Sequence, residues 1–322
     1  MHIADAIIVG GGPAGSTCAW KLRKAGLDVV VLDRAGFPRT KLCAGWVTPR
    51  ALADLELDPC DYPHSFMTFD ALLLHWKIFT VKFTSPQHSI RRYEFDDFLL
   101  RRSGATVRTH KVRKIRRDNG DFVVDDKYRS KFLVGAGGTS CPVYRTLFRQ
   151  HCPRRRSLQA ATYELEFAYN WQDPACHLWF FNDGLPGYAW YVPKANGHIN
   201  IGLGGMAGQL NKQGGNLHDY WRKFMMRLKK RGLVDCDGLR PSGYSYFLRG
   251  GVETACDRNA YLVGDAVGLA TRDMCEGIGP AIESALLAAR SIVTGSDYSL
   301  AGIAQLSGQS VISRHLERKF AG

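Results

Sequence analysis

Three closely spaced glycines behind a short apolar run constrain this chain more than any other feature of its sequence. Residues 6–9 form an uninterrupted apolar run, as in a strand buried on both faces of a parallel sheet. Gly10, Gly12 and Gly15 then follow the pattern G-x-G-x-x-G. In that pattern the first glycine permits a tight turn, the second lets backbone approach a pyrophosphate, and the third packs a helix against the strand.

The residues after the glycines extend this unit to a second strand. Pro13 suits the first turn of a helix, and Gly26 is a natural stop before the apolar run 29–32. Asp33 ends that run, about 20 residues past the glycines, where a carboxylate accepts hydrogen bonds from a ribose. The order of elements predicts dinucleotide binding. The alternative is a glycine turn that serves only for packing.

Composition is that of an ordinary globular chain. Its 322 residues, 45% hydrophobic and 23% charged, are enough for one large core or two modest ones. No apolar stretch approaches the ~18 residues of a spanning helix, and we see no cleavable signal, so we expect a cytoplasmic location. Nine scattered cysteines without a C-x-x-C pair argue against a disulfide framework and a zinc site, and no metal site is predicted.

A formal net charge of +13 raises the question of an anionic partner. Basic residues cluster at 110–117, 154–156 and 227–231. These clusters are either a solvated surface or a contact for an anionic lipid surface. No nucleic-acid motif with interleaved aromatic residues lies beside them, so we expect no nucleic-acid partner.

The first half of the chain predicts a mixture of helices and strands. A glycine-bearing loop leads into a short helix within 41–52, and 75–85 has the alternation of a strand. Residues 91–102 predict a helix with one apolar face. Asn119-Gly120 predicts a hairpin turn, which is followed by an apolar strand at 132–134.

The second half begins with an antiparallel region. Aromatic residues and period-two alternation dominate 158–205, with a hairpin turn at Asn196-Gly197. A helix is predicted at 217–230. Residues 259–270 repeat the pattern of a strand followed by glycine, and 279–293 predict a long helix.

Four segments carry a resemblance to a known family. They are the opening fingerprint ending at Asp33-Arg34, RRYEFDDFLL (91–100), VGAGGTSCPVYR (134–145) and YLVGDAVG (261–268). The chain resembles, to about residue 295, the large FAD-dependent family that includes geranylgeranyl reductases, aromatic-ring hydroxylases and flavin halogenases.

This resemblance implies an α/β fold with two domains. A Rossmann-like FAD-binding domain, with a parallel sheet and a β-hairpin layer, is expected from 1–65, 90–150 and 250–322. An antiparallel-sheet substrate domain is expected from 66–89 and 151–249.

The resemblance also implies which residues bind FAD. Asp265 would reach the ribityl and pyrophosphate region, and backbone amides of Gly277 and Ile278 would face the flavin ring. Arg92 either adds charge near the phosphates or is a surface arginine that starts a helix. The predicted cofactor-binding residues are Gly10, Gly12, Pro13, Ala14, Gly15, Asp33, Arg34, Ala44, Gly45, Arg92, Val112, Gly264, Asp265, Gly277 and Ile278.

Within the family, the reductase branch is the best match. The run 264–268 ends in glycine, where similar hydroxylases usually carry histidine, and KLCAGWVTP (41–49) looks like the reductases' cysteine-glycine loop. The resemblance implies hydride transfer from reduced flavin to a carbon-carbon double bond of an isoprenoid or other apolar substrate. Tyr188 and Trp190 would line its tunnel, or else simply pack the sheet. Cys43 would tune the site or deliver a proton, or else is a small buried hydrophobe.

Three departures from the family pattern leave alternatives open. Gly137 stands where many relatives have aspartate, so the electron donor is NADPH or another reductant. Residues 271–275 replace the usual Ser-Pro and glycine, and the chain is short after the predicted helix at 279–293. The alternatives are an FAD-dependent monooxygenase, resembling a hydroxylase or halogenase, and a flavin-binding protein without turnover. A lipid substrate with a phosphate head would give the basic surface a purpose, through peripheral contact with an anionic membrane.

Overall fold

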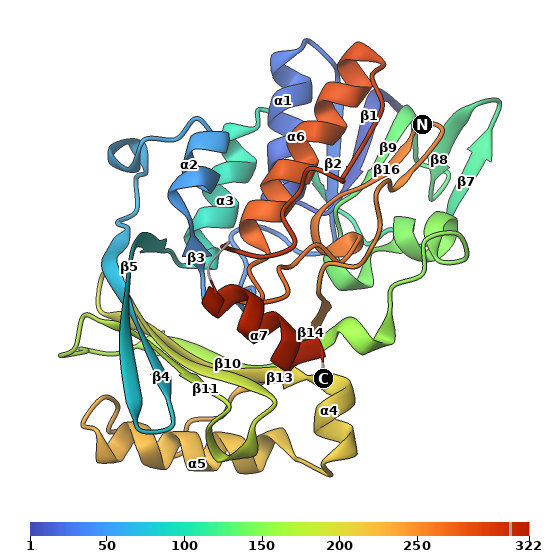
Figure 1. The fold of residues 1–322 in the computed structure, drawn as a ribbon. Helices are drawn as coiled ribbons and strands as arrows, with labels where there is room; N and C mark the ends of the chain where they lie inside the picture. Colours follow the sequence, from blue (N-terminus) through green and yellow to red (C-terminus); the bar gives the residue numbers. More distant parts are fainter. Residues whose placement is uncertain (309–310, 322) are drawn as a thin grey trace. The chain divides into compact units, whose positions relative to one another are not determined.

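The opening apolar run forms the middle of a mixed sheet in the first of two structural units (Figure 1). The computed structural model describes residues 1–308 and 311–321, and the first unit comprises 1–39, 93–155 and 246–308 of them. Its sheet has the strand order β15-β16-β9-β1-β2-β6, and a β7-β8 hairpin continues it from β9. The strands are β1 (His2–Val9), β2 (Val29–Asp33), β6 (Thr106–Thr109), β7 (Ile115–Asp118), β8 (Asp121–Val124), β9 (Tyr128–Gly135), β15 (Cys256–Asp257) and β16 (Ala260–Leu262).

Helices pack on this sheet along their apolar faces. α1 and α6 lie side by side (Figure 1), which buries the apolar side chains of both against the strands. Gly295 ends α6 in a left-handed conformation, as glycine does at many helix ends. The helices are α1 (Pro13–Lys24), α3 (Arg92–Arg102) and α6 (Ile278–Thr294), with short turns η2 (Gly138–Ser140), η3 (Tyr144–Phe148) and η6 (Gly264–Ala266).

The second unit comprises residues 40–92, 156–245 and 311–321. Its sheet has the order β14-β10-β13-β12-β11-β4-β5-β3. β11 runs parallel to β4, whereas the β10-β13, β13-β12, β12-β11, β4-β5 and β5-β3 pairs are antiparallel. The strands are β3 (Trp46–Val47), β4 (Met67–Trp76), β5 (Phe79–Ser89), β10 (Gln159–Ala168), β11 (Cys176–Phe180), β12 (Gly187–Lys194), β13 (His198–Met206) and β14 (Ser242–Phe247).

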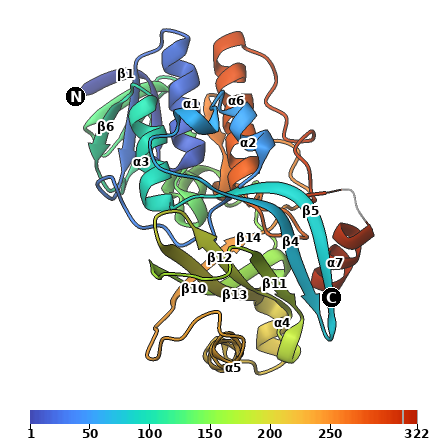
Figure 2. The ribbon, with the colours of Figure 1, turned by 90° about the vertical axis from the view of Figure 1, so that its left-hand side faces the viewer.

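One face of this second sheet is covered by α5 (Figure 2). Trp221, Phe224 and Leu228 follow helical spacing and pack on alternate residues of the strands, including Tyr191 and Ile201. The helices are α2 (Pro49–Asp54), α4 (Ala207–Lys212), α5 (Leu217–Lys230) and α7 (Val311–Ala321), with short turns η1 (Pro59–Asp61), η4 (Arg156–Leu158) and η5 (Asn182–Gly184).

The predicted fold class, an α/β chain with a Rossmann-like part and an antiparallel sheet, is confirmed. The units differ from the predicted boundaries, because 40–65 and 311–321 pack with the second unit. Residues 309, 310 and 322 of the predicted FAD-binding domain lie outside the described residues. The assignment of one domain to FAD and the other to substrate stays a prediction.

One local prediction is wrong. The strand expected at 75–85 is a hairpin, because Lys77 takes a left-handed φ of +54° and reverses the chain between β4 and β5. After α6 the chain forms one more helix, α7, which the sequence analysis did not predict. No helix among the described residues combines the length and the apolar character needed to cross a membrane.

Candidate functional site

Three loops of the first unit leave its sheet at the same edge. β1, β9 and β16 are parallel neighbours, with Val9 paired to Gly135 and Gly135 paired to Leu262. Their carboxyl ends are therefore level, and ligands of open parallel sheets bind beyond that edge. The glycine turn at 10–15, the loop after β9 and the turn η6 all begin there.

Glycine is required in the opening turn by close backbone packing. Gly10 has a φ of +111°, and a Cβ there would lie 2.7 Å from the amide nitrogen of Gly137. A Cβ on Gly15 would overlap the carbonyl oxygen of Gly10 and lie 3.2 Å from the Cβ of Ala136. Gly12 is the N-cap of α1, whose first turn carries no acidic side chain. The positive end of the helix dipole is thus available to a pyrophosphate.

Asp33 is fixed by the glycine turn itself. Its Oδ2 accepts a hydrogen bond from the Gly11 amide at 2.8 Å, and its Oδ1 accepts one from the Ala35 amide at 3.0 Å. Arg39 lies 3.8 Å from Asp33 and 3.4 Å from the buried Asp96. A carboxylate has about four acceptor positions, so lone pairs remain for ribose hydroxyls.

Asp265 lies beside the amino end of α6. Gly264 precedes it with a φ of +60°, and a Cβ there would lie 3.1 Å from Ala281 and 3.2 Å from Ala14. A Cβ on Gly277, the N-cap of α6, would lie 3.4 Å from Asp265 Oδ1. The contact with Ala14 brings this carboxylate loop to the first turn of α1.

Arg154 ties two of these loops together. Its Nη1 donates to the Thr139 carbonyl at 2.6 Å, and its Nη2 and Nε donate to the Ala266 carbonyl at 2.9 and 3.2 Å. The guanidinium stacks on the Tyr144 ring, 3.6 Å from its centroid. Burial lowers the pKa of Arg154, while nearby groups including Asp265 act in the opposite direction. We infer that Arg154 positions the loop that carries Asp265.

The residues of the first unit therefore fit an extended dinucleotide. The amino end of α1 and the two carboxylates at the same sheet edge match its diphosphate, ribose and ribityl groups. The remaining predicted residues differ in exposure. Pro13, Ala14 and Ile278 are buried in the first turns of their helices, Arg34 is exposed, and Val112 is buried in the core.

The unusual segment 271–275 is held by its own side chains. The Thr271 hydroxyl accepts from the Glu276 amide at 3.0 Å and bonds the Ser307 hydroxyl at 2.8 Å. Asp273 is fully buried, and its Oδ1 accepts from the Ser307 amide at 2.8 Å. Cys275 takes a φ of +56°. The residues that depart from the family pattern thus fix this loop against the segment that follows α6.

In the second unit, polar and aromatic side chains share one face of the sheet. Residues paired across antiparallel strands point to the same side. Glu164 pairs with Gly202, which pairs with Trp190 on β12. Two residues further along β10, Glu166 pairs with Asn200 on β13. These side chains lie opposite the face that α5 covers.

A glycine on β13 makes room for one of the two predicted aromatic residues. Tyr188 pairs with Gly204 and Trp190 pairs with Gly202. A Cβ on Gly202 would lie 2.5 Å from an atom of the Trp190 indole. The two rings are 5.7 Å apart and both are buried. The side-by-side aromatic surface that the sequence predicts is present, and its contact with substrate stays a prediction.

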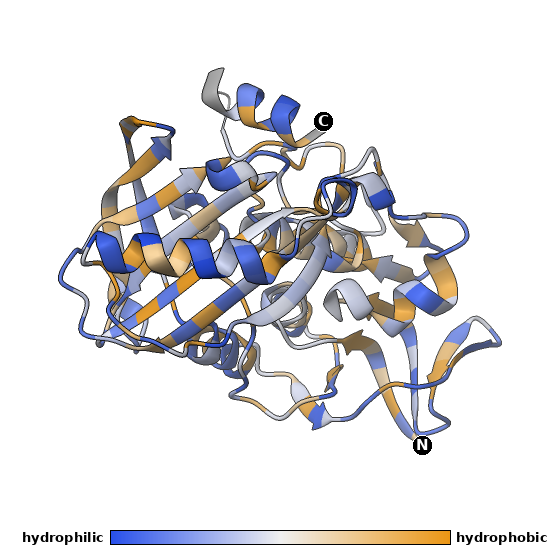
Figure 3. Cartoon of the chain, turned by 90° about the horizontal axis from the view of Figure 1, so that it is seen from below, coloured by the Kyte–Doolittle hydropathy of each residue, from blue (hydrophilic) through white to orange (hydrophobic). Residues whose placement is uncertain are grey.

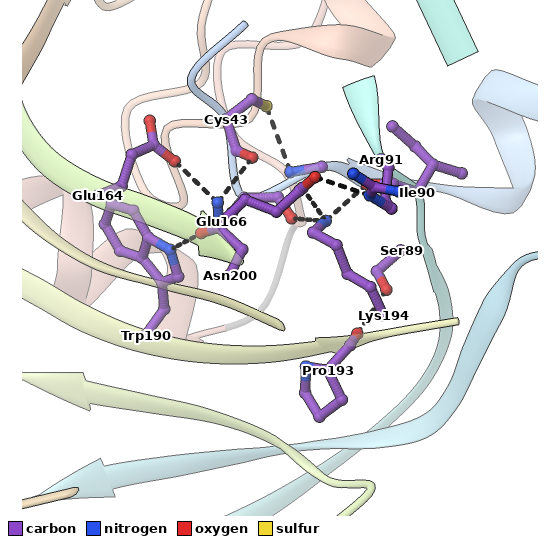
Figure 4. Close-up of polar contacts among 12 residues, drawn as sticks. Cys43, Ser89, Ile90, Arg91, Glu164, Glu166, Trp190, Pro193, Lys194 and Asn200 are labelled. Atoms are coloured by element: carbon purple, nitrogen blue, oxygen red, sulfur yellow. Dashed lines mark hydrogen bonds and ion pairs between the residues drawn. The ribbon is translucent and has the colours of Figure 1, made fainter. Parts of the chain in front are cut away.

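The Cys43 loop is held down by a buried lysine (Figure 4). Lys194 Nζ donates to the Ala44 carbonyl at 2.7 Å and the Ile90 carbonyl at 2.5 Å, and lies 3.8 Å from Glu166. A Cβ on Gly45, which has a φ of +75°, would lie 2.5 Å from Lys194 Nζ. Burial lowers the pKa of Lys194, and the nearby Glu166 opposes this. The loop that contains Cys43 and Gly45 therefore lies next to the amino group of Lys194, which hydrogen bonds hold in place.

Asn200 links the Cys43 loop to Trp190 and Glu164 (Figure 4). Its Nδ2 donates to the Cys43 carbonyl at 3.3 Å and to Glu164 Oε2 at 3.4 Å, while its Oδ1 accepts from the Trp190 indole at 2.7 Å. The Cys43 sulfur accepts a hydrogen bond from the Gly45 amide at 3.3 Å. One amide side chain thus connects three candidate catalytic positions.

Glu164 has the electrostatics of an acid that titrates near neutral pH. It is only 3% exposed, and burial raises its pKa from 4.5 to about 7. The facing cations Lys41, Lys194 and Arg92 and the hydrogen bond from Asn200 oppose that rise. Perturbed carboxyl groups of this kind are common at functional sites.

The raised pKa of Glu164 predicts how stability depends on pH. Because the folded chain binds the proton more tightly than the unfolded chain, the free energy of unfolding should fall between pH 4.5 and about 7. The loss amounts to about 3 kcal/mol. Glu164→Gln should match the wild type at pH 4 and be more stable above pH 7, measured by urea unfolding. The surface variant Glu253→Gln is the control, and an unchanged pH dependence in Glu164→Gln contradicts the prediction.

Three predicted cofactor residues lie in or next to this second cluster. Ala44 offers its carbonyl to Lys194, and Gly45 donates to Cys43. Arg92 is 8% exposed, so the surface-arginine alternative is wrong, and its charge acts on Glu164. A contact of these residues with FAD stays a prediction.

Sequence reasoning missed the polar side chains that organise both clusters. Lys194 and Asn200 flank a hairpin turn, where polar residues usually face solvent. Glu164 and Glu166 stand two apart in β10, which gives only the weak signal that both share a sheet face. Arg154 is part of a basic run that resembles a solvated surface.

Family models match both parts of the chain. Residues 8–69 match the NAD(P)-binding Rossmann-like domain, and residues 158–236 match the geranylgeranyl reductase catalytic domain. The second match contains β10, β12 and β13, and so the Glu164, Asn200 and Lys194 positions.

Comparison with individual proteins points to the same family as these family models. The chain is 30% identical to a menaquinone reductase of Mycolicibacterium smegmatis, covering 92% of this chain and 79% of that protein. It is 29% identical to a geranylgeranyl diphosphate reductase of Rhodobacter capsulatus, over 62% of this chain but only 54% of that protein. A geranylgeranyl bacteriochlorophyll reductase-like structure from Thermoplasma acidophilum has the same fold, with a TM-score of 0.77, 19% identity, and coverage of 91% and 78%.

The predicted resemblance is thereby confirmed, and with it the enzyme class and the flavin cofactor. The glycine turn with its two carboxylates supplies the dinucleotide site that such a cofactor needs. The chain belongs to the geranylgeranyl reductase-like family of FAD-dependent oxidoreductases.

Proposed function

We propose that this enzyme reduces a carbon-carbon double bond in the isoprenoid part of an apolar, lipid-like substrate. The menaquinone and geranylgeranyl diphosphate reductases to which the chain is similar are named for substrates with isoprenoid chains. The observation that carries the proposal is the pair of adjacent rings of Tyr188 and Trp190, of which Trp190 lies over Gly202 and is connected by Asn200 to the Cys43 loop.

Bound and reduced FAD supplies a hydride to one carbon of the double bond, and a proton must reach the other. The two aromatic rings orient the apolar chain and exclude water from it. We propose Cys43 and Glu164 as the groups that deliver or hold that proton. Glu164 is a candidate because its pKa of about 7 leaves the carboxyl partly protonated at neutral pH.

The position of Cys43 is set by neighbours on both sides. Asn200 holds its carbonyl, the Gly45 amide bonds its sulfur, and Lys194 anchors the next carbonyl. We propose that this anchoring keeps the thiol at one place relative to Trp190, as proton transfer requires. We propose that NADPH or another reductant supplies the electrons.

Anaerobic single-turnover spectroscopy tests the proposal. The FAD-loaded protein is reduced with dithionite without oxygen and mixed in detergent with geranylgeranyl diphosphate or a menaquinone. We expect the absorbance of oxidised flavin to return, together with a product that has gained two hydrogen atoms in its isoprenoid chain. NADPH in place of dithionite tests the physiological donor.

Other outcomes contradict the proposal in distinguishable ways. Flavin that is reoxidised only after oxygen is admitted, with an oxygenated product, identifies a monooxygenase. Flavin that binds and is reduced, but reacts with neither substrate nor oxygen to give product, identifies a binding protein without turnover. The variant Trp190→Leu should slow substrate-dependent reoxidation, whereas Trp20→Leu, in the second half of α1 and away from its amino end, should not.

A further inference from the structure

The hairpin formed by β4 and β5 exposes an unusual number of large apolar side chains. Among the described residues eleven such side chains are exposed, and five of them fall within 76–83. Ile78 at the turn is 89% exposed and Phe79 is 68% exposed. The five are Trp76, Ile78, Phe79, Val81 and Phe83.

Strand register places most of these side chains on one face. Trp76 pairs with Phe79, Leu74 with Val81 and Leu72 with Phe83. Paired residues point to the same side of an antiparallel ribbon, so the hairpin has a continuous apolar face that becomes more exposed toward its tip. In Figure 3, hydrophobic and hydrophilic colours alternate around this tip.

The part of this hairpin next to the turn carries positive charge and no negative charge. Lys77 lies in the turn beside Ile78, and Lys82 follows on β5. No Asp or Glu occurs between residues 71 and 93, in a chain with a net charge of +13. Tryptophan and lysine next to apolar side chains are the combination found at membrane interfaces, where the ring lies at headgroup level and the ammonium reaches phosphate.

We propose that the tip of the β4-β5 hairpin docks the enzyme on an anionic lipid bilayer. The inference rests on the proposed function in one respect, because an isoprenoid lipid is dissolved in such a bilayer. Ile78 and Phe79 enter the interfacial region, and Lys77 and Lys82 contact lipid phosphates.

A second copy of this chain fits the hairpin surface less well than an anionic bilayer does. Five side chains at a hairpin tip offer roughly a few hundred Å², less than the ~800 Å² that each partner buries in a stable interface. The positive charge of Lys77 in the turn would also meet the same charge of the second copy across a twofold interface. An anionic bilayer neutralises the same charges.

Vesicle flotation with the whole 322-residue chain, loaded with FAD, tests the proposal. Vesicles of phosphatidylcholine alone are compared with vesicles that also contain phosphatidylglycerol. We expect the wild type to float with the anionic vesicles, and more weakly at high salt. Ile78→Ser with Phe79→Ser should lower the bound fraction about tenfold or more, because two exposed apolar side chains lose their burial.

The matched control removes exposed apolar side chains elsewhere. Met226→Ser with Val293→Ser, at side chains that are 60% and 47% exposed, should leave flotation unchanged. A hairpin variant that floats like the wild type overturns the proposal. The proposal is also overturned if gel filtration shows that the wild type is a dimer and the hairpin variant a monomer, since the hairpin is then a dimer interface.

Turnover in detergent separates this proposal from the proposed function. The hairpin variant should reduce geranylgeranyl diphosphate in detergent at the wild-type rate, since the tip carries none of the site residues. If the wild type fails to turn over but floats through its hairpin, the proposed substrate is wrong and the docking surface stands. If it turns over but does not float, the docking surface is wrong and the function stands.

Discussion

Replacing Gly15 with alanine should prevent FAD from binding at micromolar concentrations. The added methyl group would overlap the Gly10 carbonyl oxygen and approach the Cβ of Ala136, so the first turn of α1 must move away from the sheet. That movement takes the helix amides from the pyrophosphate. Overpacking of this kind costs about 1–3 kcal/mol, and with the lost amide contacts we expect FAD affinity to fall about 100-fold. Flavin fluorescence titration of the apoprotein measures it.

A matched glycine substitution separates this effect from a general loss of stability. Nothing lies within 4 Å of a Cβ on Gly208 in α4, and its φ is not positive, so Gly208→Ala should bind FAD like the wild type. Asp265→Ala removes a carboxylate without adding bulk, and it should also lose the yellow colour. If Gly15→Ala is purified as yellow as Gly208→Ala, the cofactor placement is wrong.

Much of the fold was predictable where a pattern has a local cause. The helix at 217–230 has the predicted ends, because its apolar residues follow helical spacing and Asn216 caps it. The turns at Asn119-Gly120 and Asn196-Gly197 have φ above zero at both residues, which is the geometry that Asn-Gly favours. Local chemistry alone decides these elements.

Other elements depend on neighbours that the sequence does not reveal. The Lys77-Ile78 turn contains neither glycine nor asparagine, so nothing in 75–85 signals a reversal. Residues 40–65 follow the opening unit in sequence but pack with the second sheet, through the pairing of β3 with β5. Tertiary contacts, and not the local sequence, determine which unit a segment joins.

The residues of the candidate site also fall into a group that the sequence predicts and a group that only the structure reveals. The glycine turn, Asp33 and Asp265 lie at the ends of parallel strands, and a motif marks each of them. Glu164 and Asn200 acquire their roles only when three antiparallel strands align in register. Their sequence spacing across turns carries no motif, so only the structure brings them to the Cys43 loop.

Replacing Lys194 with methionine should release the Cys43 loop. Methionine fills the space of the lysine stem but donates no hydrogen bond, so the Ala44 and Ile90 carbonyls lose a shared donor and Glu166 loses a buried cation. Each buried carbonyl left without a partner costs about 1–3 kcal/mol. We expect the free energy of unfolding to fall by about 2–4 kcal/mol. Urea unfolding measures the loss.

Hydrogen exchange locates the effect within the chain. Amides of residues 43–47 and 90 should exchange faster in Lys194→Met, because the Ile90 amide bonds the Gly45 carbonyl and both segments share the lysine. Lys212→Met, at an exposed lysine in α4, should change neither stability nor exchange. Equal protection of 43–47 in both variants contradicts the proposed anchor, even if overall stability falls. If exchange does increase at 43–47, the activity of Lys194→Met shows what the loop does. Slow substrate reduction with normal FAD binding assigns the anchored loop to the chemical step, because the substitution changes no residue of the cofactor site in the first unit.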